Sequence, residues 1–431
     1  MIATALLYKE TGFNWMPVIP ENWETKRAKA IFQERSIKGF PDEPLLAASQ
    51  KQGVVLKEML EQRSMEAVQN FESFKLVEKD DFVISLRSFE GGIELAYYRG
   101  IISPVYSIFY FRENKHNRDF FKYLFKSRMF IQELNVYKKG IRDGQSISYS
   151  EFANIYLPVP PKAEQDEIVQ YIKAQEEKIN RFIEKKLRFI ELLKEQKLRV
   201  ITLAVTKGIR NEQLKDSQID WLGEIPESWE RTAIKRLVKI KITDGPHESP
   251  VFADEGIPFV SAEASVNGRI DLNRKRCDIS KELHEEYCKK AKAEFGDILM
   301  VKSGSTTGKI AIVDIHDEFS IWSPLALIRP NESINNEFLF YSLSSNYFQK
   351  QVQLNWSFGT QPNIGMGKIE QLIVLYPNSI DEQKQIVSHI KTETATIDTA
   401  IAKAEREIEL IREYKEAMIS EAVMGKIITN K

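Results

Sequence analysis

An internal repeat constrains this chain more than any other feature. The segment Lys9–Glu24 (KETGFNWMPVIPENWE) reappears 206 residues later as Lys215–Glu230 (KDSQIDWLGEIPESWE), and both are called lead segments below. A second pair follows at an offset of 218, because residues 164–205 and 382–423 are identical at 18 of 42 positions. A repeat of about two hundred residues is too long for a solenoid. The repeat therefore predicts a duplicated globular domain, each copy followed by a helix.

Two long helices account for the second half of each repeat. No proline or glycine occurs between Lys162 and Thr206, and apolar residues recur at spacings of three, four and seven. Such a narrow stripe is typical of a coiled coil, and each helix would be roughly 65 Å long. We expect the two stripes to pair through isoleucines, namely Ile172, Ile179, Ile183, Ile190, Ile390, Ile397, Ile401 and Ile408. Packing of each helix on its own globular domain stays open as the alternative.

The globular parts show short β-rich runs separated by polar, glycine-containing turns. Examples are Asp81–Leu86, Val105–Phe111, Asp297–Val301 and Ile310–Val313. This pattern predicts an α+β fold. The expected order is a globular domain over 1–160, a helix over 161–208, a second domain over 209–378 and a second helix with a tail over 379–431. The helices should run antiparallel as a coiled coil, with a pseudo-twofold internal repeat.

Composition excludes several classes of protein. The sequence contains no run of about 18 apolar residues, so no membrane span is predicted. The N-terminus does not resemble a signal peptide. Two cysteines provide no disulfide framework and favour a reducing, cytoplasmic setting. The net charge of −1 means that any surface for an anionic partner has to be local.

No catalytic, cofactor-binding or metal-binding set is predicted. The run Gly304–Lys309 is one residue short of a phosphate-binding loop and lacks its hydroxyl, so a tight turn between strands is the better interpretation. Cys277, His284 and Cys288 have no fourth ligand beside them and are interpreted as ordinary residues near a helix.

Clusters of cations with hydroxyl and amide groups are the remaining signal. Lysine and arginine bind phosphates, and glutamine or asparagine can read adenine edges. In the first domain the candidates for DNA contact are Arg87, Lys138, Lys139, Arg142, Gln145 and Ser146. In the second domain they are Arg269, Lys302, Ser305, Thr306, Lys309, Thr360, Gln361 and Asn363. A solvated surface with no ligand remains the alternative for any single run.

Taken together, these motifs resemble the DNA-specificity subunit of type I restriction–modification systems. The lead segment W-x-G-E-I-P-x-x-W-E at Trp221–Glu230 is similar to the start of that family's domains, as are Thr243–His247 and Asn267–Ile270. His247 joins the DNA candidates through this resemblance. In the first domain, Leu45–Ser49 and Gly100–Tyr106 match a second subtype. Met16-Pro17-Val18 departs from the usual sequence of the lead segment.

The resemblance implies a non-catalytic protein with two target recognition domains. Each domain would read one half of a split double-stranded DNA target, while the helices set the unread spacer and dock two methyltransferase subunits. S-adenosylmethionine, ATP and Mg²⁺ are expected on partner subunits, including a motor-nuclease subunit, and none on this chain. The setting would be the cytoplasm of a prokaryote. A single-chain DNA modification or cleavage enzyme and a coiled-coil protein adaptor remain alternatives.

Overall fold

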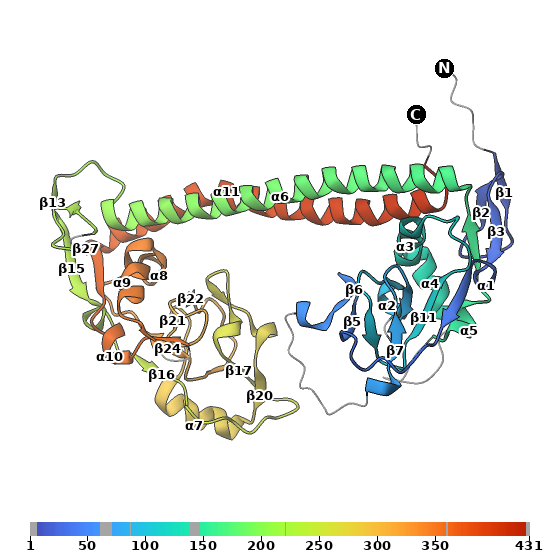
Figure 1. Ribbon diagram of the computed structural model, residues 1–431. Helices are drawn as coiled ribbons and strands as arrows, with labels where there is room; N and C mark the ends of the chain where they lie inside the picture. Colours follow the sequence, from blue (N-terminus) through green and yellow to red (C-terminus); the bar gives the residue numbers. More distant parts are fainter. Residues whose placement is uncertain are drawn as a thin grey trace, which may run out of the picture. The chain divides into compact units, whose positions relative to one another are not determined.

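The chain forms two compact units. The computed structural model describes residues 7–60, 71–86, 88–137, 147–219, 221–358 and 361–427. The first unit comprises residues 1–186 and 406–431, and the second comprises 187–405. Helices α6 (Lys162–Lys207) and α11 (Ile380–Val423) each contribute one part to each unit (Figure 1). Among the described residues, no helix is both long and apolar enough to cross a membrane.

The first unit is built on a four-stranded antiparallel sheet in the order β4-β11-β8-β9. The strands of the whole unit, including those of its small two-stranded sheets, are β1 (Tyr8–Glu10), β2 (Val18–Pro20), β3 (Glu24–Arg27), β4 (Phe32–Arg35), β5 (Leu46–Ser49), β6 (Gly53–Leu56), β7 (Lys75–Val77), β8 (Phe82–Ile84), β9 (Glu94–Leu95), β10 (Gly100–Ile102), β11 (Ser107–Phe111) and β12 (Tyr156–Val159). Its α-helices are α1 (Ala28–Ile31), α2 (Ser88–Gly91), α3 (Arg118–Lys126), α4 (Arg128–Val136), α5 (Tyr149–Phe152), the first part of α6 and the last part of α11.

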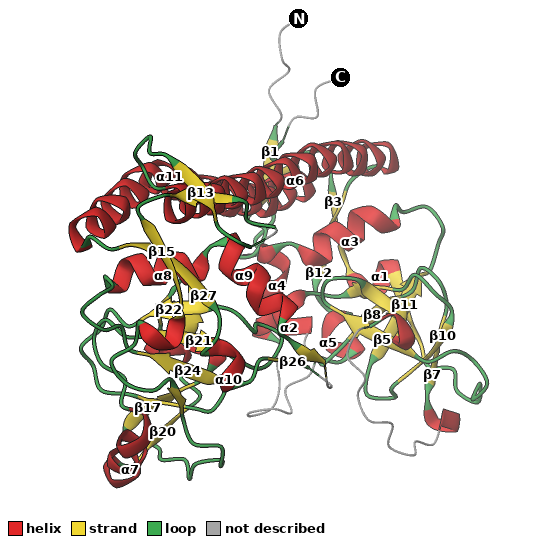
Figure 2. Cartoon of the chain, turned by 90° about the vertical axis from the view of Figure 1, so that its left-hand side faces the viewer, coloured by secondary structure: helices red, strands yellow, loops and turns green. Residues whose placement is uncertain are grey.

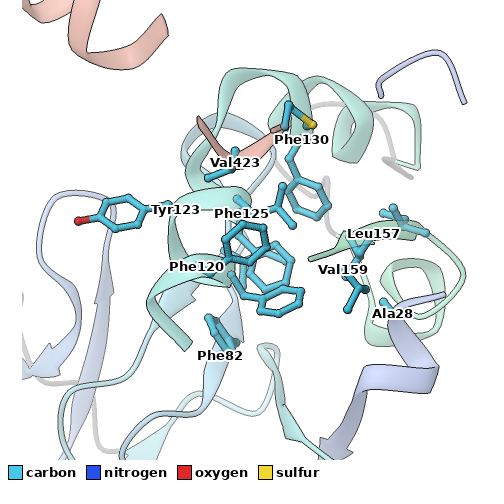
Figure 3. Packing of buried hydrophobic residues seen from close by; sticks show 14 of the residues in the cluster. Ala28, Phe82, Phe120, Tyr123, Phe125, Phe130, Leu157, Val159 and Val423 are labelled. Carbon is cyan, nitrogen blue, oxygen red and sulfur yellow. The ribbon is translucent and has the colours of Figure 1, made fainter. Parts of the chain in front are cut away.

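A phenylalanine-rich core joins this sheet to the helices. Phe82 comes from the sheet, Phe120 and Phe125 from α3, and Phe130 from α4, and all four are fully buried (Figure 3). Val423, at the end of α11, packs into the same cluster. Burying a large aromatic side chain stabilises a fold by about 2 to 3 kcal/mol. The cluster therefore couples the globular part of the first unit to its helices.

The second unit has a larger, mixed sheet. Six strands follow the order β16-β24-β21-β22-β19-β18, with β19 and β22 parallel and the other pairs antiparallel. Figure 2 shows α8 and α9 on the side of this sheet that faces the helices of the unit. The strands are β13 (Leu214–Asp216), β14 (Glu224–Pro226), β15 (Trp229–Ala233), β16 (Thr243–Asp244), β17 (Ile257–Val260), β18 (Ser265–Val266), β19 (Arg269–Ile270), β20 (Cys277–Ile279), β21 (Ile298–Val301), β22 (Ile310–Ile312), β23 (Ser320–Ile321), β24 (Leu325–Ile328), β25 (Ser357–Phe358), β26 (Pro362–Asn363) and β27 (Ile373–Pro377). The helices are α7 (Lys281–Ala291), α8 (Asn336–Ser344), α9 (Asn346–Leu354), α10 (Met366–Ile369), the end of α6 and the start of α11.

Within each unit, α6 and α11 lie side by side and run in opposite directions. In the first unit, Lys415 pairs with Glu176 at 3.0 Å and Lys186 with Glu407 at 2.5 Å, so residue numbers rise along one helix as they fall along the other. In the second unit, Lys197 pairs with Asp398 at 2.6 Å. Ile172, Ile179 and Ile408 are buried in the first unit, where Ile183 is partly buried. Ile190, Ile390 and Ile397 are buried in the second, where Ile401 is half-buried.

A tryptophan from each lead segment holds the start of one helix and the end of the other. In the first unit, the indole N–H of Trp23 donates to Glu164 of α6 at 2.7 Å, and the ring lies against Gly425, just after α11. A Cβ on Gly425 would lie 2.9 Å from that ring, and the glycine has φ +70°. No larger residue therefore fits there without displacement.

The second unit repeats this arrangement with the helices exchanged. Trp229 donates to Glu382 of α11 at 3.0 Å. Its ring lies against Gly208, which follows α6 and has φ +71°. We call each set of contacts a joint, because it ties the lead segment to both helices of its unit.

A buried glutamine completes each joint. Gln165 donates from Nε2 to the Pro160 carbonyl at 2.8 Å and accepts from the Asn117 backbone N–H at 2.8 Å. Asn117 is the N-cap of α3, so this bond also orients α3. In the second unit, Gln383 makes the same two bonds to Pro377 and Asn335, at 2.9 and 2.6 Å, and Asn335 caps α8. The joint thus fixes the globular part of each unit to its helix pair.

The joint predicts a specific loss of stability. Replacing Gln165 with leucine removes the partners of the half-buried Asn117 N–H and of the buried Pro160 carbonyl, which costs about 1 to 3 kcal/mol. We expect a lower unfolding temperature and faster hydrogen exchange at the Asn117 amide. The control is Gln170→Leu, at an exposed position on the same helix. Equal unfolding temperatures and exchange rates for the two variants would contradict the role of the joint.

Candidate nucleic-acid interface

Three segments that are distant in the sequence converge in the second unit. They are Thr243–Glu248, the turn Lys302–Lys309, and Gln361–Ile364. The turn joins β21 to β22, and Gly304 and Gly308 take φ values of +104° and +95°. The bonds from Val301 N to Lys309 O (2.8 Å) and from Gly308 N to Val301 O (2.7 Å) close it. The prediction of a tight turn between strands is confirmed, since the glycines serve the backbone conformation.

The turn packs directly against the segment that contains Gln361 and Asn363. The Gly304 N–H donates to the Pro362 carbonyl at 3.1 Å, and the Ile364 N–H donates to the Lys302 carbonyl at 2.9 Å. The Thr307 hydroxyl also donates to the Pro362 carbonyl, at 3.0 Å. These bonds hold two of the sequence candidates, Lys302 and Asn363, on adjoining backbone.

A buried carboxylate organises the cations next to this pair of segments. Asp244, at the end of β16, accepts from Lys290 Nζ at 2.7 Å and lies 3.1 Å from Lys302 Nζ and from His247 Nε2. Burial raises the pKa of Asp244, but hydrogen bonds from Lys290 and Lys302 lower it by more, so the pKa lies below its usual value of 3.8. The carboxylate is therefore ionised near neutral pH and fixes the ammonium groups of Lys290 and Lys302 and the imidazole of His247 around it.

A glycine lets the Asp244 segment approach the neighbouring strand. A Cβ on Gly245 would lie 1.9 Å from the carbonyl oxygen of Ile321, so only glycine fits. The Ser323 N–H donates to the Pro246 carbonyl at 3.1 Å, and the Trp322 indole N–H donates to the Glu248 carbonyl at 3.1 Å. The exposed His247 is thus carried by a firmly held backbone.

The surface that results combines cation, hydroxyl and amide groups. Ser305, Thr306, Gln361 and Asn363 are exposed, whereas the side chain of Lys302 is only 12% exposed. Hydroxyl and lysine groups can bind phosphate oxygens, and carboxamides can both donate to and accept from a base edge. The arrangement can therefore position a nucleic acid and read it.

Other sequence candidates lie elsewhere. Arg269 forms an ion pair with Asp314, and with Lys309 it lines a groove of about 1210 Å³ between the globular part of the second unit and its helices. Neither of them contacts Asp244. Seven further candidates lie outside the described residues: Arg87, Lys138, Lys139, Arg142, Gln145, Ser146 and Thr360.

Two residues of the site were not predicted from the sequence. Asp244 stands in the motif that suggested His247, but an acid gave no signal for an anion-binding surface. Lys290 lies on the charged helix α7 and was not among the candidates for DNA contact. His284, which lies near Cys277 and Cys288 in the sequence, forms a hydrogen bond with the Ser320 hydroxyl at 2.8 Å. In the described part of the chain, no group of His, Cys, Asp and Glu could hold a metal ion.

Comparison with known proteins identifies the class to which this duplicated frame and its site belong. Residues 20–192 and 226–410, one stretch in each repeat, match the family model of the type I restriction modification DNA specificity domain. Because these two matches cover most of the chain, the protein belongs to that family. The resemblance inferred from the sequence motifs is thereby confirmed, as are the two repeated domains of mixed helix and sheet.

Individual relatives agree with this assignment. The chain is 26% identical to the type I restriction enzyme MjaVIII specificity subunit of Methanocaldococcus jannaschii, with 99% of this chain and 98% of the relative aligned. It is 23% identical to the EcoBI specificity subunit of Escherichia coli, over 73% of this chain and 67% of that protein. A chain from a structural study of complex assembly in a type I R-M system has the same fold, with a TM-score of 0.63 at 15% identity, covering 95% of this chain and 99% of that chain.

The ion pairs of Asp244 with Lys290 and Lys302 predict that removing the Asp244 charge destabilises the second unit. Asp244→Asn leaves Lys302 largely buried without its counter-charge, which should cost about 3 kcal/mol in the free energy of unfolding of the second unit. Because the folded pKa of Asp244 lies below 3.8, its contribution is complete above that pH and is lost only as the pH falls through the folded value. Urea unfolding at neutral pH measures the difference. The exposed Asp254→Asn is the control, and equal unfolding midpoints for the two variants would contradict this role.

Proposed function

We propose that this chain is the DNA-specificity subunit of a type I restriction–modification complex, in which each unit reads one half of a bipartite target. The observation that carries the proposal is the convergence of the Lys302–Lys309 turn with Gln361–Ile364, beside the lysines that pair with Asp244. The family match to each repeat supports it. So does the contrast between two nearly identical joints and two different sheets.

The division of labour at the site follows from its chemistry. Lys290 and His247 would contact phosphates and set the position of the duplex, while the largely buried Lys302 would hold the carboxylate of Asp244 in place. Gln361 and Asn363 would reach base edges, where a carboxamide can pair with both N6 and N7 of adenine. The affinity would come largely from the cations and would fall with salt, while the amides would decide the sequence.

The two long helices would set the spacer between the half-sites. In this proposal α6 and α11 form an antiparallel coiled coil with pseudo-twofold symmetry. The buried isoleucines and the ion pairs of each unit support it. Helices of 46 and 44 residues would each be roughly 65 Å long, more than one DNA turn of about 34 Å. Two domains held by such a frame would read bases separated by an unread stretch.

The same helices would dock two methyltransferase subunits. Large apolar side chains are exposed along both helices, and such side chains can supply the contacts of a protein interface. In the first unit these are Phe182, Leu410 and Tyr414, and in the second Leu187, Leu192 and Leu203. Catalysis would belong to the partners: S-adenosylmethionine on the methyltransferase subunits, and ATP with Mg²⁺ on a motor-nuclease subunit. This chain would itself be non-catalytic and would act in the cytoplasm of a prokaryotic cell.

Selection from randomised duplex DNA tests the proposal. The full chain assembled with type I methyltransferase subunits should enrich a target of two short half-sites with an unread spacer, and it should methylate adenines within them. Sequencing of the enriched DNA and of the methylated adenines gives the result. Methylation by this chain alone would favour a single-chain enzyme instead. No DNA preference in any assembly would favour a protein adaptor.

Gln361 provides the residue-level test. Gln361→Ala should relax one base pair of one half-site by about 5-fold to 150-fold, the loss expected for one bidentate contact, and leave the other half-site unchanged. The matched control is Gln353→Ala, an exposed glutamine of α9. Unchanged preference in both halves would show that Gln361 is not a reader.

A further inference from the structure

A β-hairpin in the first unit has the build of a base reader. Strands β5 and β6 pair antiparallel from Leu46–Leu56 to Ser49–Gly53, which leaves Gln50, Lys51 and Gln52 as the turn (Figure 1). Gly53 takes φ +79°, and the Gln52 N–H donates to the Ser49 hydroxyl at 3.3 Å. A three-residue turn closed by a left-handed glycine is a regular hairpin form, so the tip has a defined conformation.

The two strands of the hairpin are fixed in the body of the unit. Leu46 and Val54 are buried in an apolar cluster with Val83 of β8 and Ile108 of β11. The Tyr97 N–H donates to the Val54 carbonyl at 3.1 Å, which links β6 to the chain after β9. Because both strands of the hairpin carry buried apolar residues, the polar tip is carried on a rigid base and not on a free loop.

The tip is also held from its side. The ammonium of Lys126 donates to the Gln50 carbonyl at 3.2 Å and to the Gly91 carbonyl at 2.8 Å, and it pairs with the buried Glu94. Gly91 has no side chain where the side chain of Gln50 passes, since a Cβ there would lie 2.7 Å from Cδ of Gln50. The carboxylate of Glu94 is buried and paired with Lys126, so it adds no exposed negative charge at the tip.

The side chains at the tip are the kinds that read DNA. Gln50, Lys51 and Gln52 are exposed, and no acidic residue occurs from Leu46 to Lys57. Tyr97 lies beside the tip with 37% of its surface exposed, and the ammonium of Lys122 lies 5.7 Å from its ring centroid. A two-stranded β-ribbon fits the major groove of DNA, where a glutamine can bond N6 and N7 of adenine together.

We propose that the β5–β6 hairpin enters the major groove, that Gln50 and Gln52 read bases of the half-site recognised by the first unit, and that Lys51 binds a phosphate. This inference rests on the proposed function and assigns the reading element of the first unit. Since the two units read separate halves, a change at this tip acts on one half alone. The other half then reports whether the assembly is intact.

The test uses the full chain assembled with methyltransferase subunits and a pool of randomised duplex DNA. Gln50→Ala and Gln52→Ala are each expected to lower discrimination at one base pair of a single half-site by about 5-fold to 150-fold. Lys51→Ala is expected to weaken binding equally for all sequences and to reduce the slope of log affinity against log salt by about 0.9. The control is Gln132→Ala, an exposed glutamine of α4.

The outcomes separate this inference from the function on which it rests. Selection of an unaltered target by the Gln50→Ala/Gln52→Ala double variant would overturn the inference and leave the proposed function standing. Absence of any split target for the wild-type assembly would instead refute the function. Thermal unfolding of each variant, expected to match the wild type because the tip is exposed, excludes a folding defect as the cause of a changed preference.

Discussion

The tryptophan–carboxylate bond of each joint is the interaction on which the rest of the structure depends. Trp23 and Trp229 are almost fully buried and each donates its indole N–H to a glutamate in the first turn of a long helix. The same ring covers the glycine that ends the other helix of that unit. An indole has one polar atom and a large apolar face, so a single side chain can satisfy a carboxylate and bury a helix end together. Both helices of a unit therefore meet the globular part at one defined place.

The joint explains which residues recur in the sequence and which do not. The Glu-Gln pair at 164–165 and 382–383 recurs because each member makes a specific bond to the frame, and no other side chain reproduces both bonds of the glutamine. The sheets carry no such requirement. The largest described sheet of the first unit has four antiparallel strands, and that of the second unit has six strands of mixed direction. A frame that demands specific side chains can thus carry surfaces that are free to differ, which suits a protein that reads two different half-sites.

Local patterns predicted the regular elements well. The helix expected from Lys162 to Thr206 is α6, Lys162–Lys207, because a proline-free stripe with period 3.6 has few alternative structures. The runs Asp81–Leu86 and Ile310–Val313 contain β8 and β22. The same 218-residue offset also relates Asn117 to Asn335 and Ser127 to Ser345, which cap the helices α3, α8, α4 and α9. That signal was present in the sequence, but single cap residues are too common to be noticed without the structure.

From the sequence by itself follow the duplication, the two long helices, the absence of a recognisable catalytic motif and the family. All of these rest on residue order, spacing or chemical type along the chain. Only the tertiary structure decided that Lys302, Gln361 and His247 belong to one surface, that Asp244 and Lys290 organise it, and that Arg269 lies elsewhere. The physical reason is that contacts between residues tens of positions apart depend on strand order and register, which many pairings of short strands could satisfy equally well. Packing of the whole unit selects one of those pairings.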